Sequence, residues 1–235
     1  MKKSTRKVFL ISCALLMVSS SQAESRKALT INSTGVGDNT NTYGERATAA
    51  AYALNSNLLF PGTNNVDQSI NTGGILKFSM KWPTTFLGTS MGFGVGGGLG
   101  PSVVTKLEDG LGNNAYEETI GATFAVVSFE IEKRKQLGKH WFASLVGSAG
   151  YFKGHAKREV DITRGAFLTQ PTFPGNEKKE WDGVTASIMP TIGLGTGQKE
   201  MRLGVGWSYL SDMPSFVHGP ALDSQSWGAT WALLW

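Results

Sequence analysis

Two segments at the C-terminal end of the sequence alternate strictly between apolar residues and small or polar ones. In residues 199–210 and 224–235 the apolar positions are Met201, Leu203, Val205, Trp207, Tyr209, Trp227, Ala229, Trp231, Leu233 and Trp235. A period of two is that of a β-strand with one apolar face. Aromatic residues near the strand ends, ionisable groups on the opposite face and an aromatic last residue favour a membrane barrel over a soluble sandwich.

The first 23 residues have the pattern of a secretory signal peptide. Four basic residues precede an apolar run over residues 8–18, and Ser21-Gln22-Ala23 offers small residues for cleavage. The run is too short to span a bilayer as a helix, and the sequence around Cys13 only faintly resembles a lipoprotein site. We therefore expect residues 1–23 to be removed, residues 24–44 to form an N-terminal periplasmic tail, and residues 45–235 to form the barrel.

The charged, cysteine and histidine residues of the sequence give no reason to expect nucleic acid, a disulfide, a metal or a cofactor. The chain has 22 basic and 18 acidic residues, and four basic and no acidic ones lie in the leader, so 18 of each remain. A neutral mature chain gives no reason to expect nucleic acid as a partner. Cys13 is the one cysteine and lies in the leader, so we expect no disulfide. Because histidines at metal-ligand spacing are also missing from the sequence, we expect no metal and no cofactor.

The connections between the predicted strands alternate in length. Strands are predicted at 46–55, 70–82, 87–99, 118–131, 141–155, 181–194, 199–210 and 224–235, and a short one at 29–32 also fits. The connections 56–69, 100–117, 157–179 and 211–223 are long, whereas 83–86, 132–139 and 195–198 are short. This order predicts an all-β, antiparallel up-and-down transmembrane β-barrel of eight strands, with long extracellular loops and short periplasmic turns, in a bacterial outer membrane.

These features carry a resemblance to a known class. Leader, strand count, loop order and aromatic terminus make the mature chain similar to the small eight-stranded outer-membrane barrels, which include OmpA-like, OmpX-like and lipid A-modifying proteins. The stretch Met189-Pro190-Thr191-Ile192-Gly193-Leu194-Gly195-Thr196-Gly197 and the hairpin 132–150 also resemble the lipid A palmitoyltransferase family. The resemblance to that family implies a catalytic group made of a histidine near the first strand and an aspartate and a serine at the outer rim.

The sequence departs from that catalytic pattern. It has no histidine before His140, and its adjacent Ser211-Asp212 and Asp223-Ser224 lie in other strands. The resemblance therefore implies the fold and a lipid-accommodating interior rather than the transferase reaction. We expect a barrel without enzymatic activity that has a lipid-binding, structural or surface-interaction role.

Two alternatives remain open at this point. One is a lipid A-modifying enzyme of the acyltransferase or deacylase kind, for which the candidate catalytic residues are His218, Asp212, Asp223 and His155. In such an enzyme a histidine acts as base and a carboxylate orients it. The other is a narrow porin-like pore, which eight strands disfavour because side chains just fill so small a barrel.

Strand parity places a set of ionisable side chains inside the predicted barrel. They are Lys77, Lys81, Glu200 and Arg202, joined by Glu130 if Phe129 faces lipid. Because an unpaired buried charge costs several kcal/mol, these groups should form an ion cluster near the periplasmic end.

Alternate glycines mark one wall of the predicted interior. Gly92, Gly94, Gly96 and Gly98 lack the side chains that would line this wall. In one interpretation Phe124 and Val126 on the next strand fill the space, large against small. In the other the wall stays bare and holds a lipid acyl chain, which Pro190 would help to enter by removing a ladder hydrogen bond.

The expected partners follow from the outer-membrane setting. Lys153, Lys157 and Arg158 lie near the outer rim, where they could contact lipopolysaccharide phosphates; the alternative is a charged loop balanced by its own acids. Other expected partners are outer-membrane lipids and the barrel-assembly machinery, which would engage the C-terminal strand. We expect a monomer.

Overall fold

The structure is a computed structural model. It describes residues 25–34, 38–63, 65–71, 73–84, 86–100, 102–169, 171, 175–195, 199–213 and 222–235. The strands are β1 (Arg26–Thr34), β2 (Val66–Asn71), β3 (Gly73–Pro83), β4 (Thr89–Leu99), β5 (Ser102–Glu108), β6 (Asn114–Gln136), β7 (Trp141–Ile162), β8 (Glu177–Gly195), β9 (Glu200–Met213) and β10 (Leu222–Leu234). The helix is α2 (Asp38–Asn55). The leader predicted at residues 1–23 lies outside the described residues.

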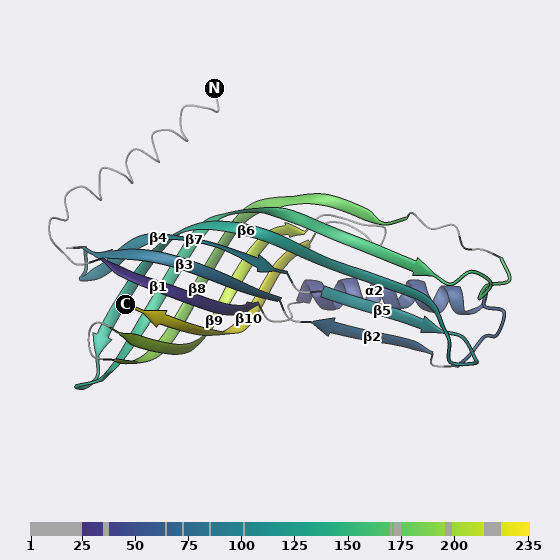
Figure 1. Ribbon diagram of the computed structural model, residues 1–235, viewed down its shortest axis with the longest axis horizontal. Helices are drawn as coiled ribbons and strands as arrows, with labels where there is room; N and C mark the ends of the chain where they lie inside the picture. Colours follow the sequence, from purple (N-terminus) through teal and green to yellow (C-terminus); the bar gives the residue numbers. More distant parts are fainter. Residues whose placement is uncertain are drawn as a thin grey trace, which may run out of the picture.

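Eight of the described strands close into an antiparallel barrel. Around the ring they follow the order β1, β3, β4, β6, β7, β8, β9 and β10, and β10 returns to β1 with Ala28 opposite Leu234. β6 and β7 pair along their whole length, from Gln136↔Phe142 to Tyr116↔Ile162. The chain end and the short connections lie at one end of the barrel, and α2, β2 and β5 lie beyond the other (Figure 1). The predicted fold class is therefore confirmed.

The first strand of the barrel differs from the prediction. Residues 26–34, predicted to belong to a periplasmic tail with at most a short strand at 29–32, form β1 between β3 and β10. Residues 46–55, predicted to be a strand, belong to α2 instead. Alanine has the highest helix propensity, and Ala47 and Ala51, one helical turn apart, are 1% and 0% exposed. Within the described residues no helix is long and apolar enough to cross a membrane.

Three of the predicted extracellular loops contain regular structure. β2 occupies the end of 56–69, β5 and the start of β6 occupy most of 100–117, and β7 extends to Ile162. Beyond the barrel, β5 replaces β4 beside β6, with Val103 opposite Ile120, and β2 adds to β5. The sequence pattern concealed these strands because charged side chains occupy their outward positions, as in the Lys106–Glu117 ion pair of 3.2 Å.

We call residues 38–71, 102–121 and 156–169 the arm. Its sheet continues from β6 and β7, and α2 packs against β2 and β5. The arm has a hydrophobic core of its own, made by Ala51, Leu58, Leu107, Ala115, Tyr116 and Phe167. The turn from β5 to β6 is held by Asp109, which accepts hydrogen bonds from the backbone N–H groups of Leu111 and Asn113 at 2.9 and 2.8 Å. The arm is therefore a packed extension rather than a set of loops.

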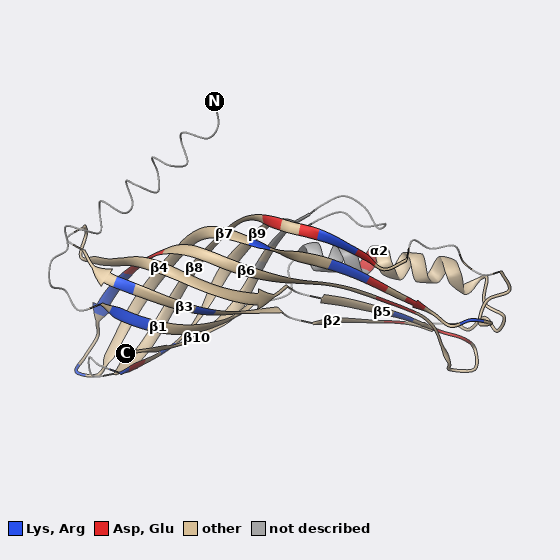
Figure 2. Cartoon of the chain, turned by 45° about the horizontal axis from the view of Figure 1, so that its top comes forward, with Lys and Arg blue, Asp and Glu red and all other residues tan. Residues whose placement is uncertain are grey.

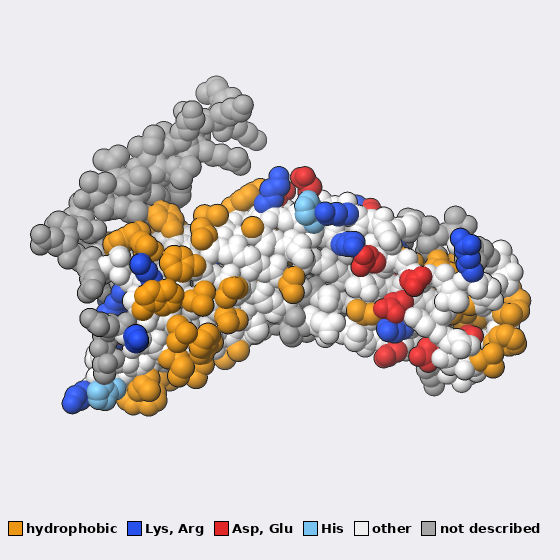
Figure 3. Space-filling model, viewed as in Figure 1, with side chains coloured by type: hydrophobic (Ala, Val, Ile, Leu, Met, Phe, Trp, Pro, Cys, Tyr) orange, Lys and Arg blue, Asp and Glu red, His pale blue; other side chains and the backbone are white. Residues whose placement is uncertain are grey.

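Side chains sort by parity along the barrel strands. On β3 the outward Leu76 and Phe78 are 53% and 38% exposed, whereas Lys77 and Lys81 are 5% exposed. On β6 Phe124 points inward and Val127 outward, which resolves the parity that the sequence left ambiguous. Hydrophobic side chains gather over the barrel, and charged ones over the strands that lead into the arm (Figure 3). An apolar belt around a polar interior is the arrangement of a transmembrane barrel.

Candidate functional site

The periplasmic half of the barrel interior holds a buried ion cluster. Lys77 and Lys81 come from β3, Glu130 and Glu132 from β6, and Arg202 from β9. Lys77 pairs with Glu130, and Lys81 lies 3.0 Å from Glu130 and 3.1 Å from Glu132. Arg202 continues the chain of contacts with Glu132 at 2.8 Å. All five side chains are at least nine-tenths buried.

A second group of charges closes the periplasmic mouth. Glu200, itself buried, accepts from Arg134 at 2.7 Å and lies 3.6 Å from Arg26. The guanidinium of Arg134 stacks over the Phe142 ring at 3.6 Å, so that an aromatic side chain and a cation fill the opening together. Figure 2 shows this concentration of charged positions at the end where the chain terminates, and a second group toward the arm.

The structure thus brings together all five residues predicted for the interior cluster, in two adjacent groups. Sequence reasoning missed Glu132 and Arg134, because they were assigned to a charged turn. In the structure β6 continues through both residues to Gln136. The signal that could have found them is parity, since both have the same parity as Glu130.

The middle of the interior is polar and almost filled. Ser148 and Ser187 share a hydrogen bond of 2.6 Å, and Thr230 donates to Asn32 at 3.0 Å. A cavity of about 30 Å³ remains at this level. Such a space holds about two water molecules, far below the several hundred Å³ of a typical ligand pocket.

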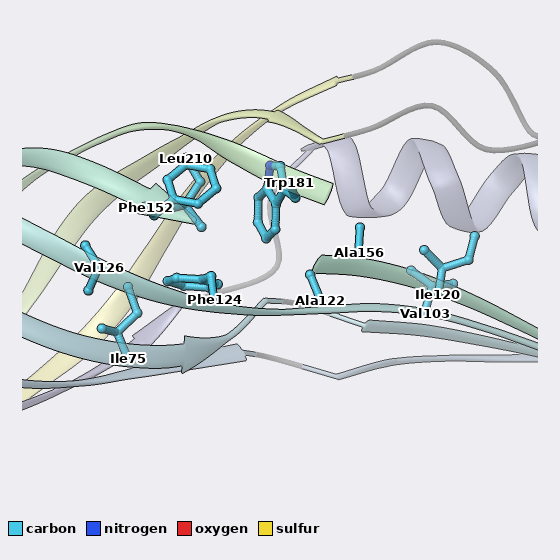
Figure 4. Close-up of a cluster of buried hydrophobic side chains, with 10 residues drawn as sticks. All are labelled: Ile75, Val103, Ile120, Ala122, Phe124, Val126, Phe152, Ala156, Trp181 and Leu210. Atoms are coloured by element: carbon cyan, nitrogen blue, oxygen red, sulfur yellow. The ribbon is translucent and has the colours of Figure 1, made fainter. Parts of the chain in front are cut away.

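An aromatic plug closes the extracellular end of the barrel (Figure 4). Trp181 packs edge-to-face on Phe124 and Phe152, with ring centroids 5.6 and 4.8 Å away. Its indole N–H donates to the Ser211 carbonyl at 2.9 Å. Val126 and Leu210 belong to the same buried cluster. With the ion cluster at the other end, this plug leaves no continuous channel through the described residues.

The glycine wall predicted to receive an acyl chain is occupied. A Cβ on Gly94 would lie 2.9 Å from Lys77 Cδ and 3.0 Å from Glu130 Oε1, so this glycine makes room for the ion pair. A Cβ on Gly96 would lie 2.3 Å from the Leu76 carbonyl oxygen. At Gly98 the Phe124 ring fills the space, at 3.0 Å. At Gly92 the Met80 carbonyl oxygen lies only 1.8 Å from the Cβ position. The glycines serve close approach and large-against-small packing, and the interpretation as a bare wall is wrong.

Replacing Gly94 with leucine is expected to destabilise the barrel by about 1–3 kcal/mol, because the new side chain overpacks the Lys77–Glu130 pair. The measurement is urea unfolding in detergent. Gly147→Leu is the control, since the nearest contact of its added Cβ would be an ordinary 3.4 Å to Ile131. If Gly94→Leu instead kept full stability and lost bound lipid, the packed interior would be contradicted.

A third group of buried polar side chains lies in the arm. Arg158, 0% exposed, pairs with Glu118, which also accepts from the Tyr116 hydroxyl at 2.8 Å. Burial and the Glu118 carboxylate raise the pKa of the Tyr116 phenol far above its usual value, so Tyr116 stays a donor. Arg158 is therefore structural, and its predicted contact with lipopolysaccharide is wrong.

The other predicted rim residues lie in different situations. Lys153 and Lys157 are exposed on the outward face of β7. His155 is half-buried and stands opposite Glu180 in the register of β7 and β8. His218 and the side chains of Asp212 and Asp223 lie outside the described residues, so the predicted catalytic group stays a prediction. Among the described residues no cluster of three or more histidine, cysteine, aspartate or glutamate side chains could hold a metal ion.

Comparisons with known proteins do not assign a function to this chain. No known protein family matches the chain, and no curated protein matches it either. Among solved structures the chain is similar to Ail, the attachment invasion locus protein of Yersinia pestis, solved in complex with the heparin analogue sucrose octasulfate. The identity is 12% and the TM-score 0.33, and the alignment covers 89% of this chain and 94% of Ail. So distant a similarity supports no statement about function.

The closed ring of strands, the apolar exterior and the ion-paired interior define the class. The chain is a small transmembrane β-barrel of the outer-membrane type, with a filled interior and an extracellular arm.

Proposed function

We propose that this chain is an outer-membrane protein whose function is surface interaction, carried by the arm, with the barrel as a rigid membrane anchor. The observation that carries the proposal is the arm itself. Barrel strands continue past the membrane, gain β2 and β5, and are covered by α2 over a separate hydrophobic core. The filled barrel interior supports anchoring over transport or storage of a lipid.

Contact with lipopolysaccharide at the extracellular rim is a second function that we propose. Lys157 and Lys178 are exposed and stand directly opposite each other on β7 and β8. Like charges in such a pair repel unless an anion lies nearby. Glu159 pairs with Lys157, which leaves Lys178 and the exposed Lys153 as candidate partners for lipid phosphates. Lys153 is only loosely held, 3.8 Å from Glu180.

Deleting part of the arm tests the main proposal. Thr34 and Gly73 are directly paired between β1 and β3, so an Asn-Gly turn can replace residues 35–72 without breaking the barrel ring. This change removes α2 and β2. We expect the variant to keep the mobility shift between heated and unheated samples that marks a folded barrel. Cells that display it should lose binding to host-cell monolayers and immobilised glycans.

The control and the opposing outcome use the same cells. Gly138→Ala, in the turn between β6 and β7 at the other end of the barrel, should leave folding and binding close to those of the unaltered protein, because nothing lies within 4 Å of the added Cβ. If cells with the full chain bind no better than cells without it, surface interaction is refuted. If mass spectrometry showed that the protein changes the acylation of lipid A, the alternative of a lipid A-modifying enzyme would be favoured instead.

A further inference from the structure

A groove crosses the outer wall of the barrel in its periplasmic half. It has a volume of about 940 Å³, and its apolar lining includes Ala143, Leu145, Pro190, Ile192, Leu203 and Val205. We call it the Pro190 groove. These residues come from β7, β8 and β9 and have the outward parity of their strands, so the groove opens toward lipid. Pro190 is five residues before the end of β8, which corresponds to roughly 12 Å along the barrel axis.

An interruption of the sheet forms the floor of the groove. The pairing of β8 with β9 includes Ile188↔Trp207 and Thr191↔Gly204 but omits Met189 and Pro190 between them. Proline has no N–H group to donate to the ladder. Ala143 on β7 stands opposite Ile192 on β8, and its small side chain deepens the groove beside this interruption.

The groove does not lead into the barrel. Behind it the inward side chains of Met189, Thr191 and Ser144 are 4–6% exposed. The hydroxyls of Ser144 and Thr191 share a hydrogen bond of 2.7 Å. Pro190 therefore makes a depression in the wall rather than the lateral entrance considered from the sequence. A lipid chain can lie along the depression from outside.

Cationic side chains border the groove at the periplasmic rim. Lys133 stands opposite Leu145, and Lys135 stands opposite Ala143; both lysines are exposed and line the groove. Lys133 also donates to the Leu87 carbonyl in the turn between β3 and β4, so its ammonium group lies at the rim and has to leave this carbonyl to reach a phosphate over the groove. The nearby acids Glu132 and Glu200 point inward and are paired there. The outward rim at this position is therefore positively charged.

We propose that the Pro190 groove binds an anionic phospholipid of the periplasmic leaflet. The acyl chains lie over the apolar lining, and Lys133 and Lys135 hold the headgroup phosphate. Position in the membrane wall selects lipid as the occupant, and the charge at the rim selects an anionic headgroup, because lysine stems follow apolar surface while their ammonium groups reach the interface. This site is independent of the arm and of its proposed function.

The test measures lipid retention by the full barrel in native mass spectrometry. The probes are phosphatidylglycerol and phosphatidylcholine with identical acyl chains. We expect phosphatidylglycerol to bind about tenfold more tightly, and the double variant Lys133→Ala/Lys135→Ala to abolish this preference. Ala143→Phe fills the groove from the lipid side, so it should weaken the binding of both lipids.

Lys27→Ala is the matched control for charge. Lys27 is another exposed lysine near the periplasmic rim, on β1, which lies three strands away from β6 in the ring. It should leave the preference unchanged. Equal affinities for the two lipids, or a preference that survives in the double variant, would overturn the proposal. So would full displacement of phosphatidylglycerol by inorganic phosphate, which would indicate a simple anion site.

Discussion

Replacing Glu130 with glutamine is expected to destabilise the barrel by about 3–5 kcal/mol. Glu130 is 2% exposed and is the shared partner of Lys77 and Lys81. Its removal leaves Lys77 without a carboxylate in a closed interior, and an uncompensated buried charge is far more costly than the loss of an exposed ion pair. The measurement is the free energy of unfolding from urea titration in detergent, followed by gel mobility and tryptophan fluorescence.

Two further variants make this prediction specific. The double change Lys77→Met/Glu130→Leu removes one cation and one anion together, so it should recover more than half of the lost stability. Glu180→Gln is the control, because its pairing with Lys153 is 3.8 Å long and exposed; its effect should stay within about 0.5 kcal/mol. If Glu130→Gln and Glu180→Gln lowered the free energy of unfolding equally, the cluster would not be a dry ion network.

Replacing Trp181 with alanine is expected to cost about 3–5 kcal/mol, the range for deleting a large buried aromatic side chain. Trp181 is 1% exposed, and it lies where the barrel meets the arm. The change leaves a cavity between Phe124 and Phe152 and removes the donor to the Ser211 carbonyl. The arm should then become more sensitive to limited proteolysis, while the membrane-embedded strands stay protected.

Trp181→Phe separates packing from hydrogen bonding at this position. Phenylalanine keeps much of the aromatic contact but has no N–H group, so we expect a smaller loss of about 1–2 kcal/mol. Equal losses for alanine and phenylalanine would show that the hydrogen bond rather than the plug dominates. Unchanged stability for both variants would contradict a closed extracellular end.

The barrel itself could be predicted well from the sequence, because strand parity is a local property. Where a strand borders both lipid and a polar interior, every second residue must be apolar. This rule placed Lys77 and Arg202 inward and Leu76 and Trp235 outward before any pairing was known. It failed on α2 and indicated only residues 29–32 of β1, since this short strand has few apolar residues and its neighbours on either side are far away in the sequence.

The content of the barrel interior could not be predicted in the same way. Parity gave two compatible interpretations for Gly94 and Gly96, one packed and one open. Which one holds depends on the side chains that the neighbouring strands bring opposite them, Lys77 from β3 and Phe124 from β6. That choice is made by register, which sequence alternation alone does not determine.

The sequence by itself determined that this chain forms a membrane barrel with charges inside, because the bilayer imposes a period of two on every spanning strand. Only the tertiary structure decided that the interior is filled and that Arg158 is buried beside Glu118. It also decided that parts of three predicted loops join α2 in a packed arm. These outcomes depend on contacts between residues far apart in the chain. Such contacts leave no periodic signal, because partners on different strands become neighbours only once pairing and shear are set.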